Sequence, residues 1–209
     1  MTIGRLTIKR FKDGLTLAEY LQIEQDLVKE VQEPTFFTWV VRPTVIYGRH
    51  QSAEVEVNEA YCREHGIAVV QRKSGGGCVY ADEGNLMMSF VTPDTHSEQV
   101  FEQFLQRIAN AMQAKGLPAV TTAHNDILVD GRKVSGWACF TCSTGTIVHG
   151  TLLYDVNLDA LTQAITPTGD KLAKHGVASV RQRVANINEL TNVFSDIQEL
   201  RAYIEEYGN

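Results

Sequence analysis

The chain has 209 residues, of which 44% are apolar and 21% are charged, a balance typical of one globular domain with a sizeable core. A formal net charge of −6 argues against a general affinity for nucleic acid. The N-terminus lacks an apolar signal segment and no apolar run approaches a membrane span, so we expect a cytoplasmic protein without membrane contact. Four cysteines outside any secretory context predict free thiols.

The first half of the chain alternates strand and helix patterns. Thr16 and Glu19 fit a capping box, and the apolar residues that follow recur at helical spacing. Asn58 is a suitable N-cap for a short helix that Gly66 closes. We therefore expect an edge strand within 2–11, helices over 16–30 and 58–65, and strands over 35–41, 45–47, 67–71, 78–80 and 86–91.

The second half contains the clearest helix, which Ser97 starts and Gly116 ends. Asp130-Gly131 supplies the type I′ turn of a hairpin, and a strand over 145–154 carries Gly150, a sign that another group approaches closely. Short helices over 158–165 and 170–175 and a final helix over 195–207 are also expected. Strands thus interleave with helices, which predicts the α+β class, with a mostly antiparallel sheet packed with helices in one domain.

Three successive glycines, Gly75, Gly76 and Gly77, lie between two strand-like runs. Glycine allows a tight turn and lets a ligand reach main-chain N–H groups, so this turn can cradle an anion. Arg72 and Ser74 beside it suit recognition of a phosphate or carboxylate. A plain hairpin loop is the alternative. The chain has neither G-x-x-x-x-G-K-[ST] nor G-x-G-x-x-G after a strand, so a nucleotide site here is of another kind.

The predicted hairpin turn also fixes which side chains share a face. Leu128 should face Lys133 and Asp126 should face Ser135, and the period of two puts all four on one side. A carboxylate, an ammonium and a hydroxyl are therefore expected together, although Lys133 alone could be a solvated hairpin lysine. His149 has no obvious partner, and its role stays open between a catalytic and a structural one.

Five motifs follow one another along the chain, with Asp82 and Gly84-Asn85 after the first of them. They are Arg72-Lys73-Ser74-Gly75-Gly76-Gly77-Cys78-Val79-Tyr80, Asn125-Asp126-Ile127, Gly131-Arg132-Lys133-Val134-Ser135-Gly136, His149-Gly150-Thr151-Leu152-Leu153 and Ser179-Val180-Arg181-Gln182-Arg183-Val184-Ala185-Asn186. In order and spacing, over about 16–190, they resemble lipoate-protein ligases. The resemblance implies the catalytic domain shared with biotin ligases, here as a single domain over 1–209 with no C-terminal accessory domain.

The resemblance further implies an ATP-dependent enzyme that uses Mg²⁺, activates lipoate to lipoyl-AMP and transfers the lipoyl group to a lysine. The implied acceptors are lipoyl domains of 2-oxoacid dehydrogenase complexes or the H protein of glycine cleavage. Many such ligases carry an extra C-terminal domain implicated in activation, whereas this chain stops soon after Leu190. A separate accessory protein is therefore one expectation.

The resemblance also assigns roles to individual residues. Lys133 is the implied catalytic residue, because it matches the lysine that contacts the substrate carboxylate and the α-phosphate. Asp126 is implied to hold the nucleotide or its Mg²⁺. The other residues implied in binding ATP and lipoyl-adenylate are Arg72, Gly75, Gly76, Gly77, Cys78, Val79, Tyr80, Asn85, Ser135, His149 and Gly150.

The alternative keeps the fold and changes the reaction. Related octanoyl- and lipoyl-transferases use no ATP, and some use a cysteine in the loop after the conserved lysine as the acyl nucleophile. Cys139 and Cys142 lie in that segment, where they could equally be two unreactive thiols. Two departures from the family pattern, Ala81 and Trp137, could reshape the acyl pocket. We expect neither cysteine to be catalytic. A protein that binds lipoyl domains without catalysing a reaction is disfavoured, because Arg72, Asp126 and Lys133 are all present.

Overall fold

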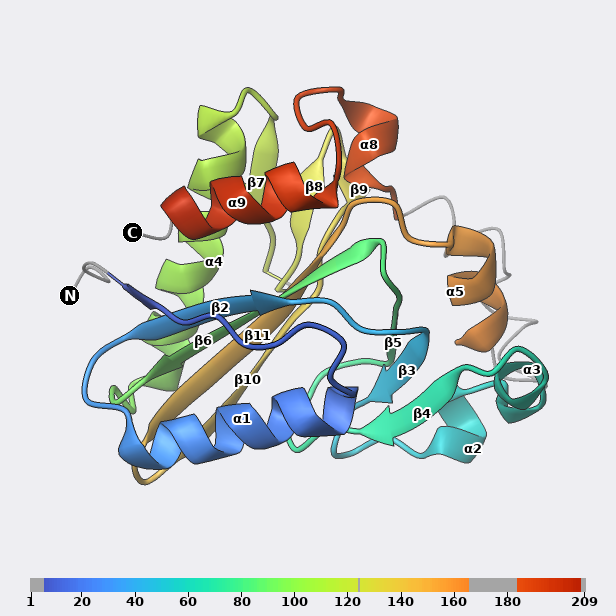
Figure 1. The fold of residues 1–209 in the computed structure, drawn as a ribbon, viewed down its shortest axis with the longest axis horizontal. Coiled ribbons are helices and arrows are strands. Elements are labelled where there is room, and N and C mark those ends of the chain that lie inside the picture. The colour runs from blue at the N-terminus through green and yellow to red at the C-terminus, as the bar shows by residue number, and fades with distance from the viewer. Residues whose placement is uncertain (1–5, 124, 166–183, 208–209) are drawn as a thin grey trace.

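The computed structural model describes residues 6–123, 125–165 and 184–207 (Figure 1). Its strands are β1 (Thr7–Ile8), β2 (Thr35–Trp39), β3 (Thr44–Tyr47), β4 (Ala68–Gln71), β5 (Val79–Ala81), β6 (Asn85–Thr92), β7 (Ala119–Thr121), β8 (Ile127–Val129), β9 (Arg132–Lys133), β10 (Trp137–Cys142) and β11 (Gly145–Leu153). Its helices are α1 (Leu17–Glu30), α2 (Ala53–Glu56), α3 (Glu59–Glu64), α4 (Ser97–Ala114), α5 (Leu158–Ala164), α8 (Ile187–Leu190) and α9 (Ile197–Tyr207). None of these helices is both long and apolar enough to cross a membrane.

The main sheet has five strands in the order β1-β2-β6-β11-β10. Only β1 and β2 pair in parallel, and the other neighbours are antiparallel. Every residue of β6 is buried, because helices cover both faces of the sheet at its centre. β10 is an edge strand. The predicted α+β class with a mostly antiparallel sheet is confirmed.

Two apolar clusters lie on the two faces of this sheet. On one face, the apolar stripe of α4 packs onto β6 and β11, and the rings of Phe104 and Phe90 stack with centroids 4.7 Å apart. On the other face, α1 supplies Tyr20, whose ring stacks on Trp39 of β2 at 4.5 Å. Burying one such side chain contributes about 1.5–3 kcal/mol. The sheet is thereby a rigid support for the side chains that line its surface.

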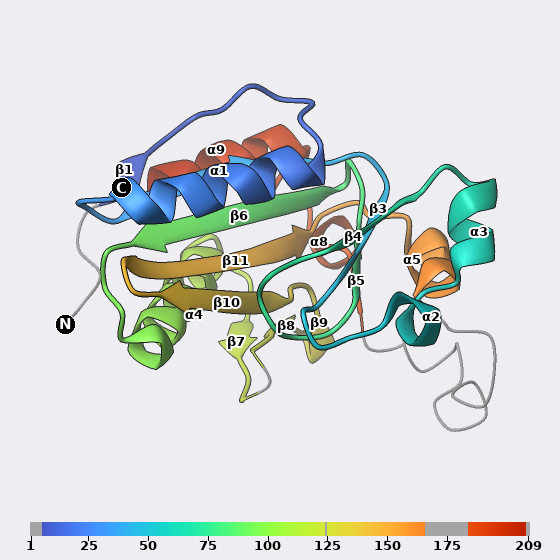
Figure 2. The ribbon, with the colours of Figure 1, turned by 90° about the horizontal axis from the view of Figure 1, so that it is seen from below.

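Two smaller sheets complete the fold. One of them has the strand order β4-β3-β5, in which β3 pairs in parallel with β4 and antiparallel with β5. This sheet lies with α2, α3 and α5 at one end of the molecule (Figures 1 and 2). The other small sheet, β7-β8-β9, is antiparallel. The glycine turn joins β4 to β5, and the predicted hairpin is β8 and β9. The two motifs therefore come from separate sheets.

Local signals are confirmed where the sequence makes them strong. The capping box of α1 is present, since the N–H of Thr16 donates to Glu19 Oε2 at 2.7 Å. In the hairpin, Leu128 pairs with Lys133 as predicted. Its turn residues Asp130 and Gly131 have φ values of 49° and 75°, as a type I′ turn requires.

One assignment is wrong, and several elements were not predicted. Residues 137–142 are not a loop but strand β10, and their side chains alternate between the two faces of the sheet. Cys139 consequently packs under α4 and Cys142 under α1. The elements α2, β7 and α8 have three or four residues each, too few for a periodic pattern to reveal. The helix expected over 170–175 lies outside the described residues.

Candidate functional site

The glycine turn is held in shape by the side chain of Arg72. Its guanidinium donates hydrogen bonds of 2.7–3.1 Å to the carbonyl oxygens of Gly75, Gly77 and Ile46. Gly76 has a φ of +89°, a conformation that glycine adopts without strain. The turn is therefore an ordered structure and not a plain loop.

Arg72 donates hydrogen bonds to carbonyl groups of the turn, and the N–H groups of the turn remain available to a ligand. Those of Gly75, Gly76 and Gly77 donate no hydrogen bond to any residue that the structure describes. Arg72 is 6% exposed and has no carboxylate partner in the same described ranges, while burial lowers the pKa of its guanidinium. An arginine keeps its charge at neutral pH even so. An uncompensated buried cation beside free amides favours a bound anion.

The hairpin places a second cation near the turn. Lys133 Nζ lies 2.7 Å from Asp126 Oδ1, and the two side chains are 36% and 19% exposed. The predicted pairing of ammonium and carboxylate is confirmed. The predicted hydroxyl is not beside them, because Ser135 is fully buried and its Oγ accepts hydrogen bonds from the N–H of Ile127 and from Trp137 Nε1. Ser135 stabilises the strand junction and does not face the site.

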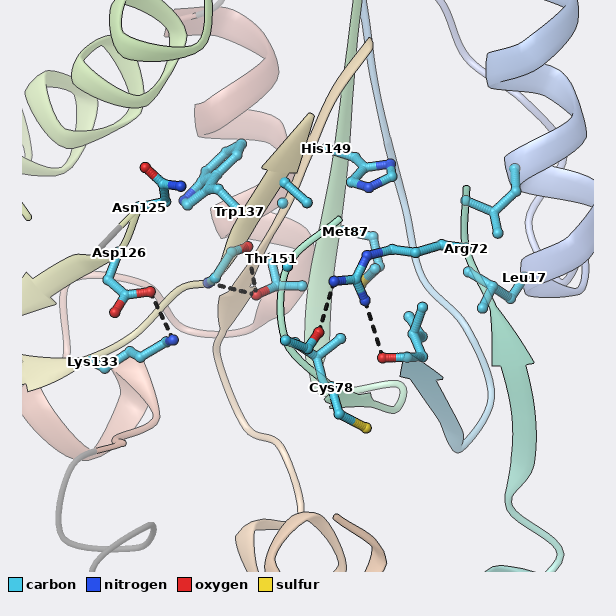
Figure 3. Close-up of a pocket in the computed structure, with 18 of the residues that line it drawn as sticks. Leu17, Arg72, Cys78, Met87, Asn125, Asp126, Lys133, Trp137, His149 and Thr151 are labelled. Atoms are coloured by element: carbon cyan, nitrogen blue, oxygen red, sulfur yellow. Dashed lines mark hydrogen bonds and ion pairs between the residues drawn. The ribbon is translucent and has the colours of Figure 1, made fainter. Parts of the chain in front are cut away.

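A pocket of about 190 Å³ connects the turn with the ion pair (Figure 3). Lys133 and Asp126 lie at one end of the close-up and Leu17 at the other, with Arg72 between them. The pocket is lined by Leu17, Leu21, Trp39, Ile46, Arg72, Gly76, Gly77, Cys78, Val79, Met87, Asn125, Asp126, Lys133, Gly136, Trp137, Ala138, His149, Gly150 and Thr151. An apolar end and a cationic end together suit an acid with a hydrocarbon chain.

Several residues of the apolar end were not among the predicted site residues. Leu17 and Leu21 are four positions apart on one face of α1, and Trp39 and Met87 lie on neighbouring strands of the main sheet. In the sequence these patterns are the same as those of ordinary core residues. Only the tertiary structure shows that the core is hollow here.

His149 belongs to a buried polar network. Its Nδ1 lies 3.0 Å from Glu24 Oε2, and its Nε2 lies 2.7 Å from Ser74 Oγ. Glu24 also accepts a hydrogen bond from Ser89, which in turn accepts one from Trp39 Nε1. The carboxylate of Glu24 accepts from Nδ1–H, so a neutral ring has Nε2 free to accept from the serine hydroxyl. Since Ser74 is 2% exposed, the network fixes the start of the turn and presents no nucleophile.

Gly150 is where another group approaches β11, as predicted. A Cβ atom at this position would lie 2.1 Å from Cε3 of Trp137. The indole ring therefore packs directly over the backbone of β11 and forms part of the pocket wall. Trp137 thus lines the pocket, and its effect on the shape of an acyl site stays a prediction.

The cysteines are poorly placed for nucleophilic chemistry. Burial raises the pKa of Cys78, the thiol in the pocket, to about 12, and burial also raises that of Cys139. The hydroxyl of Thr144 lowers the pKa of Cys142, but this thiol lies at the β10–β11 turn and lines none of the pockets around Lys133. All four cysteines are free, as predicted.

A second pocket, of about 540 Å³, opens on the other side of Lys133 and Asp126. Tyr80 lines this pocket and not the first one, and so do Ile165 and Val184, the described residues that flank 166–183. Its lining is Cys78, Val79, Tyr80, Thr122, Asp126, Leu128, Gly131, Lys133, Gly136, Thr151, Leu153, Leu161, Ile165 and Val184. Lys133 therefore stands between two spaces that a ligand could span.

Asn85 was expected to bind a ligand, and the structure does not support that assignment. It begins β6, is fully buried and lines none of the pockets described above. Neither its amide nitrogen nor its amide oxygen has a partner within the described ranges. Of the glycines, Gly75 likewise lies outside the first pocket.

The residues around Asp126 suit a magnesium ion only if a ligand supplies most of its oxygen atoms. The described residues contain no cluster of three His, Cys, Asp or Glu side chains that could hold a metal ion alone. Asp126 Oδ1 is paired with Lys133, and no hydrogen bond of Oδ2 is seen among the described residues. One carboxylate plus substrate phosphates is how Mg²⁺ is commonly bound. When bound, Mg²⁺ would supply further charge neutralisation for those phosphates.

Residues 16–207 match the family described as Lipoyl protein ligase A/B catalytic domain, and the chain belongs to this family. Lipoate-protein ligase LplJ of Bacillus subtilis is 38% identical over 187 residues, covering 88% of this chain and 56% of the relative. Lipoate–protein ligase 1 of Staphylococcus aureus is also 38% identical over 187 residues, covering 88% and 57%. The chain spans about half the length of the curated relatives it matches.

Solved structures share the fold. A bi-partite lipoate protein ligase from Thermoplasma acidophilum, studied with its E2 lipoyl domain, has a TM-score of 0.81 and 24% identity, covering 99% of this chain and 82% of that chain. Lipoate-protein ligase A bound with ATP has a TM-score of 0.79 and 24% identity, covering 99% and 84%. At this identity the likeness concerns the fold alone, and it agrees with the expected biotin/lipoate-ligase-like domain.

Proposed function

We propose that the protein is a lipoate-protein ligase, which activates lipoate with ATP and transfers the lipoyl group to a lysine of an acceptor protein. The observation that carries the proposal is the pocket that ends at Lys133 and at the free N–H groups of the glycine turn. The names of the relatives support it, as do neighbouring folds solved with ATP or with lipoic acid.

In the first half-reaction a carboxylate oxygen of lipoate attacks the α-phosphorus of ATP, and the bond to pyrophosphate breaks. Two anions must meet, so the main task of the protein is electrostatic. The apolar end of the pocket holds the hydrocarbon chain. The ammonium of Lys133 and the turn amides lie where negative charge develops, and Asp126 positions that ammonium. No covalent enzyme intermediate is needed.

In the second half-reaction the amine of the acceptor lysine attacks the carboxyl carbon of lipoyl-AMP. The lysine ammonium first loses one proton to solvent to become the nucleophilic amine; a C–N bond then forms, the bond from carbon to the AMP oxygen breaks, AMP leaves as an anion, and the nitrogen loses a second proton to solvent. The charge that develops on AMP and on the carbonyl oxygen arises beside the same Lys133 and turn amides. One set of donors therefore serves both steps.

The finer assignments are parts of the same proposal. We infer that the nucleotide is used with Mg²⁺ near Asp126, and that the acceptors are lipoyl domains, including the H protein of glycine cleavage. The T. acidophilum ligase was studied together with an E2 lipoyl domain, which supports this class of acceptor. Four free thiols support a cytoplasmic location. A separate accessory protein remains a prediction.

The test is release of pyrophosphate from MgATP upon addition of lipoate, and we expect release that depends on both. The alternative reaction, ATP-independent transfer from an octanoyl carrier protein, needs a reactive cysteine. The raised pKa values of Cys78 and Cys139 disfavour that reaction. Absence of pyrophosphate, together with acyl transfer from the carrier protein without ATP, would contradict the proposal and favour the transferase.

A further inference from the structure

We propose that a groove beside α4 admits the segment of the acceptor protein that carries the target lysine; this inference rests on the proposed function. The groove has a volume of about 1050 Å³ and is lined by residues of α4, of the segment after β7 and of the edge strand β10. Figure 2 shows α4, β7 and β10 on the same side of the molecule. It is lined by Gly75, Gly76, Ser97, Glu98, Phe101, Glu102, Gln103, Leu105, Gln106, Thr121, Thr122, Ala123, Asn125, Trp137, Ala138 and Cys139.

The groove is continuous with the site. Gly76, Asn125, Trp137 and Ala138 line both the groove and the first pocket, and Asn125 directly precedes the aspartate that pairs with Lys133. An acyl group in the first pocket and a nucleotide in the second would thus leave the groove as a third approach to the reacting carbon. A reaction with three substrates requires such an approach.

The negative charge of the groove favours the acceptor lysine over lipoate and ATP. Glu98 and Glu102 are exposed, lie one helical turn apart on α4, and form no ion pair with any described residue. Among the residues that the structure describes, no lysine or arginine lines the groove, whereas Arg72 and Lys133 line the first pocket. Lipoate and ATP are anions, and the side chain of the acceptor lysine approaches as a cation. Two unpaired carboxylates repel the former and attract the latter.

Glu98 and Glu102 would therefore act on the encounter with the acceptor and not on the chemistry at Lys133. Steering of this kind raises the rate of association and weakens as ionic strength increases. The expected signature is an acceptor KM that depends on these two charges, while formation of the adenylate does not.

The experiment compares wild-type protein with the charge-reversed variant Glu98→Lys/Glu102→Lys and the neutral variant Glu98→Gln/Glu102→Gln. Lipoate-dependent exchange of pyrophosphate into ATP measures adenylation, and transfer to an apo lipoyl domain measures the second step. We expect exchange within twofold of wild type and an acceptor KM at least fivefold higher after charge reversal, with a smaller rise for the neutral variant. Added salt should reduce the difference. Cleavage of lipoyl-AMP by hydroxylamine, a small neutral nucleophile, should stay unchanged.

The matched control is Glu54→Lys/Glu64→Lys, which makes the same change of charge on exposed residues of α2 and α3, at the other end of the molecule (Figure 1). An acceptor KM that is unaltered, or that rises equally in the control, would overturn the inference, as would a rise in the KM for ATP or lipoate alone. Lack of exchange in the wild-type protein would instead contradict the proposed function. The two failures are therefore distinguishable.

Discussion

Lys133 and Arg72 are the lysine and arginine that line the first pocket within the described ranges, and their surroundings give them different tasks. Lys133 is 36% exposed and its ammonium is paired, among the described residues, with Asp126, so it can turn to a substrate with little change elsewhere. Arg72 is buried and holds the carbonyl groups of the glycine turn. We therefore expect changes at Lys133 to alter rates and changes at Arg72 to alter stability as well.

For Lys133→Ala we expect adenylation and transfer to fall by roughly 10²–10³-fold, the loss typical of removing one preorganised donor. The free energy of unfolding should change by less than about 1 kcal/mol, because the ion pair is partly exposed and screened by solvent. Steady-state kinetics and urea denaturation measure the two quantities. A variant with near-native turnover would show that Lys133 is not the catalytic residue.

For Arg72→Ala we expect the free energy of unfolding to fall by about 2–4 kcal/mol, because the carbonyl groups of Ile46, Gly75 and Gly77 lose a charged donor at once. Affinity for the anionic substrates should fall as well. Arg42→Ala is the control, since Arg42 is exposed, and it should change stability by less than about 0.5 kcal/mol. Equal stability of the two variants would contradict the role given to Arg72.

The thiols should differ in their reactivity at neutral pH. Burial raises the pKa of Cys78 to about 12, so this thiol stays protonated, and burial also raises those of Cys62 and Cys139. Cys142 has a lowered pKa and should react first with iodoacetamide. Peptide mass spectrometry after timed labelling measures the order. Faster labelling of Cys78 or Cys139 than of Cys142 would favour the alternative, an ATP-independent transferase that uses a cysteine.

At the scale of elements, the network of Glu24 and His149 connects α1, β6, β11 and the glycine turn. For His149→Ala we expect a loss of about 1–3 kcal/mol in the free energy of unfolding, because the buried carboxylate of Glu24 loses the imidazole donor and keeps only the hydroxyl of Ser89. Adding Glu24→Gln should recover part of that loss by removing the charge. A double variant no more stable than His149→Ala would show that the charge of Glu24 is not the cause.

Elements could be predicted where a local signal is strong. The capping box of α1, the stripe of α4 and the Asp130-Gly131 turn all depend on residues near one another in the chain, and the structure confirms them. β10 was missed, because its side chains pack on both faces of the sheet, so the segment shows no alternation of apolar and polar residues. Short elements such as α2 were missed for want of length.

At the scale of the molecule, the polar part of the site could be predicted from motifs, and its apolar part could not. Asp126 and Lys133 are brought together by a turn of two residues, which the sequence specifies. The partners of His149 lie 75 and 125 positions away, and only the packing of α1 on the sheet brings Glu24 near. Ser135 was expected beside Lys133 and Asp126, but its Oγ accepts a hydrogen bond from Trp137 Nε1 at the start of the next strand, a contact that the hairpin pattern does not specify.

At the scale of the whole molecule, we propose that the three substrates occupy three separate spaces, two of which share the ion pair of Lys133 and Asp126 while the third reaches the first pocket at Asn125. The first pocket has apolar walls, the second lies beyond Lys133, and the groove beside α4 carries unpaired carboxylates. We propose that Lys133 and the glycine turn promote formation of lipoyl-AMP and then transfer of its acyl group to an amine.

The most direct test of this claim is a single-turnover experiment on the purified protein with MgATP and lipoate, quenched in acid and analysed by mass spectrometry. We predict that lipoyl-AMP accumulates on the wild-type protein, disappears when an apo lipoyl domain is added, and does not form on Lys133→Ala. Modification of the lipoyl domain without any lipoyl-AMP, or with an acyl adduct on a cysteine of the protein, would contradict the account.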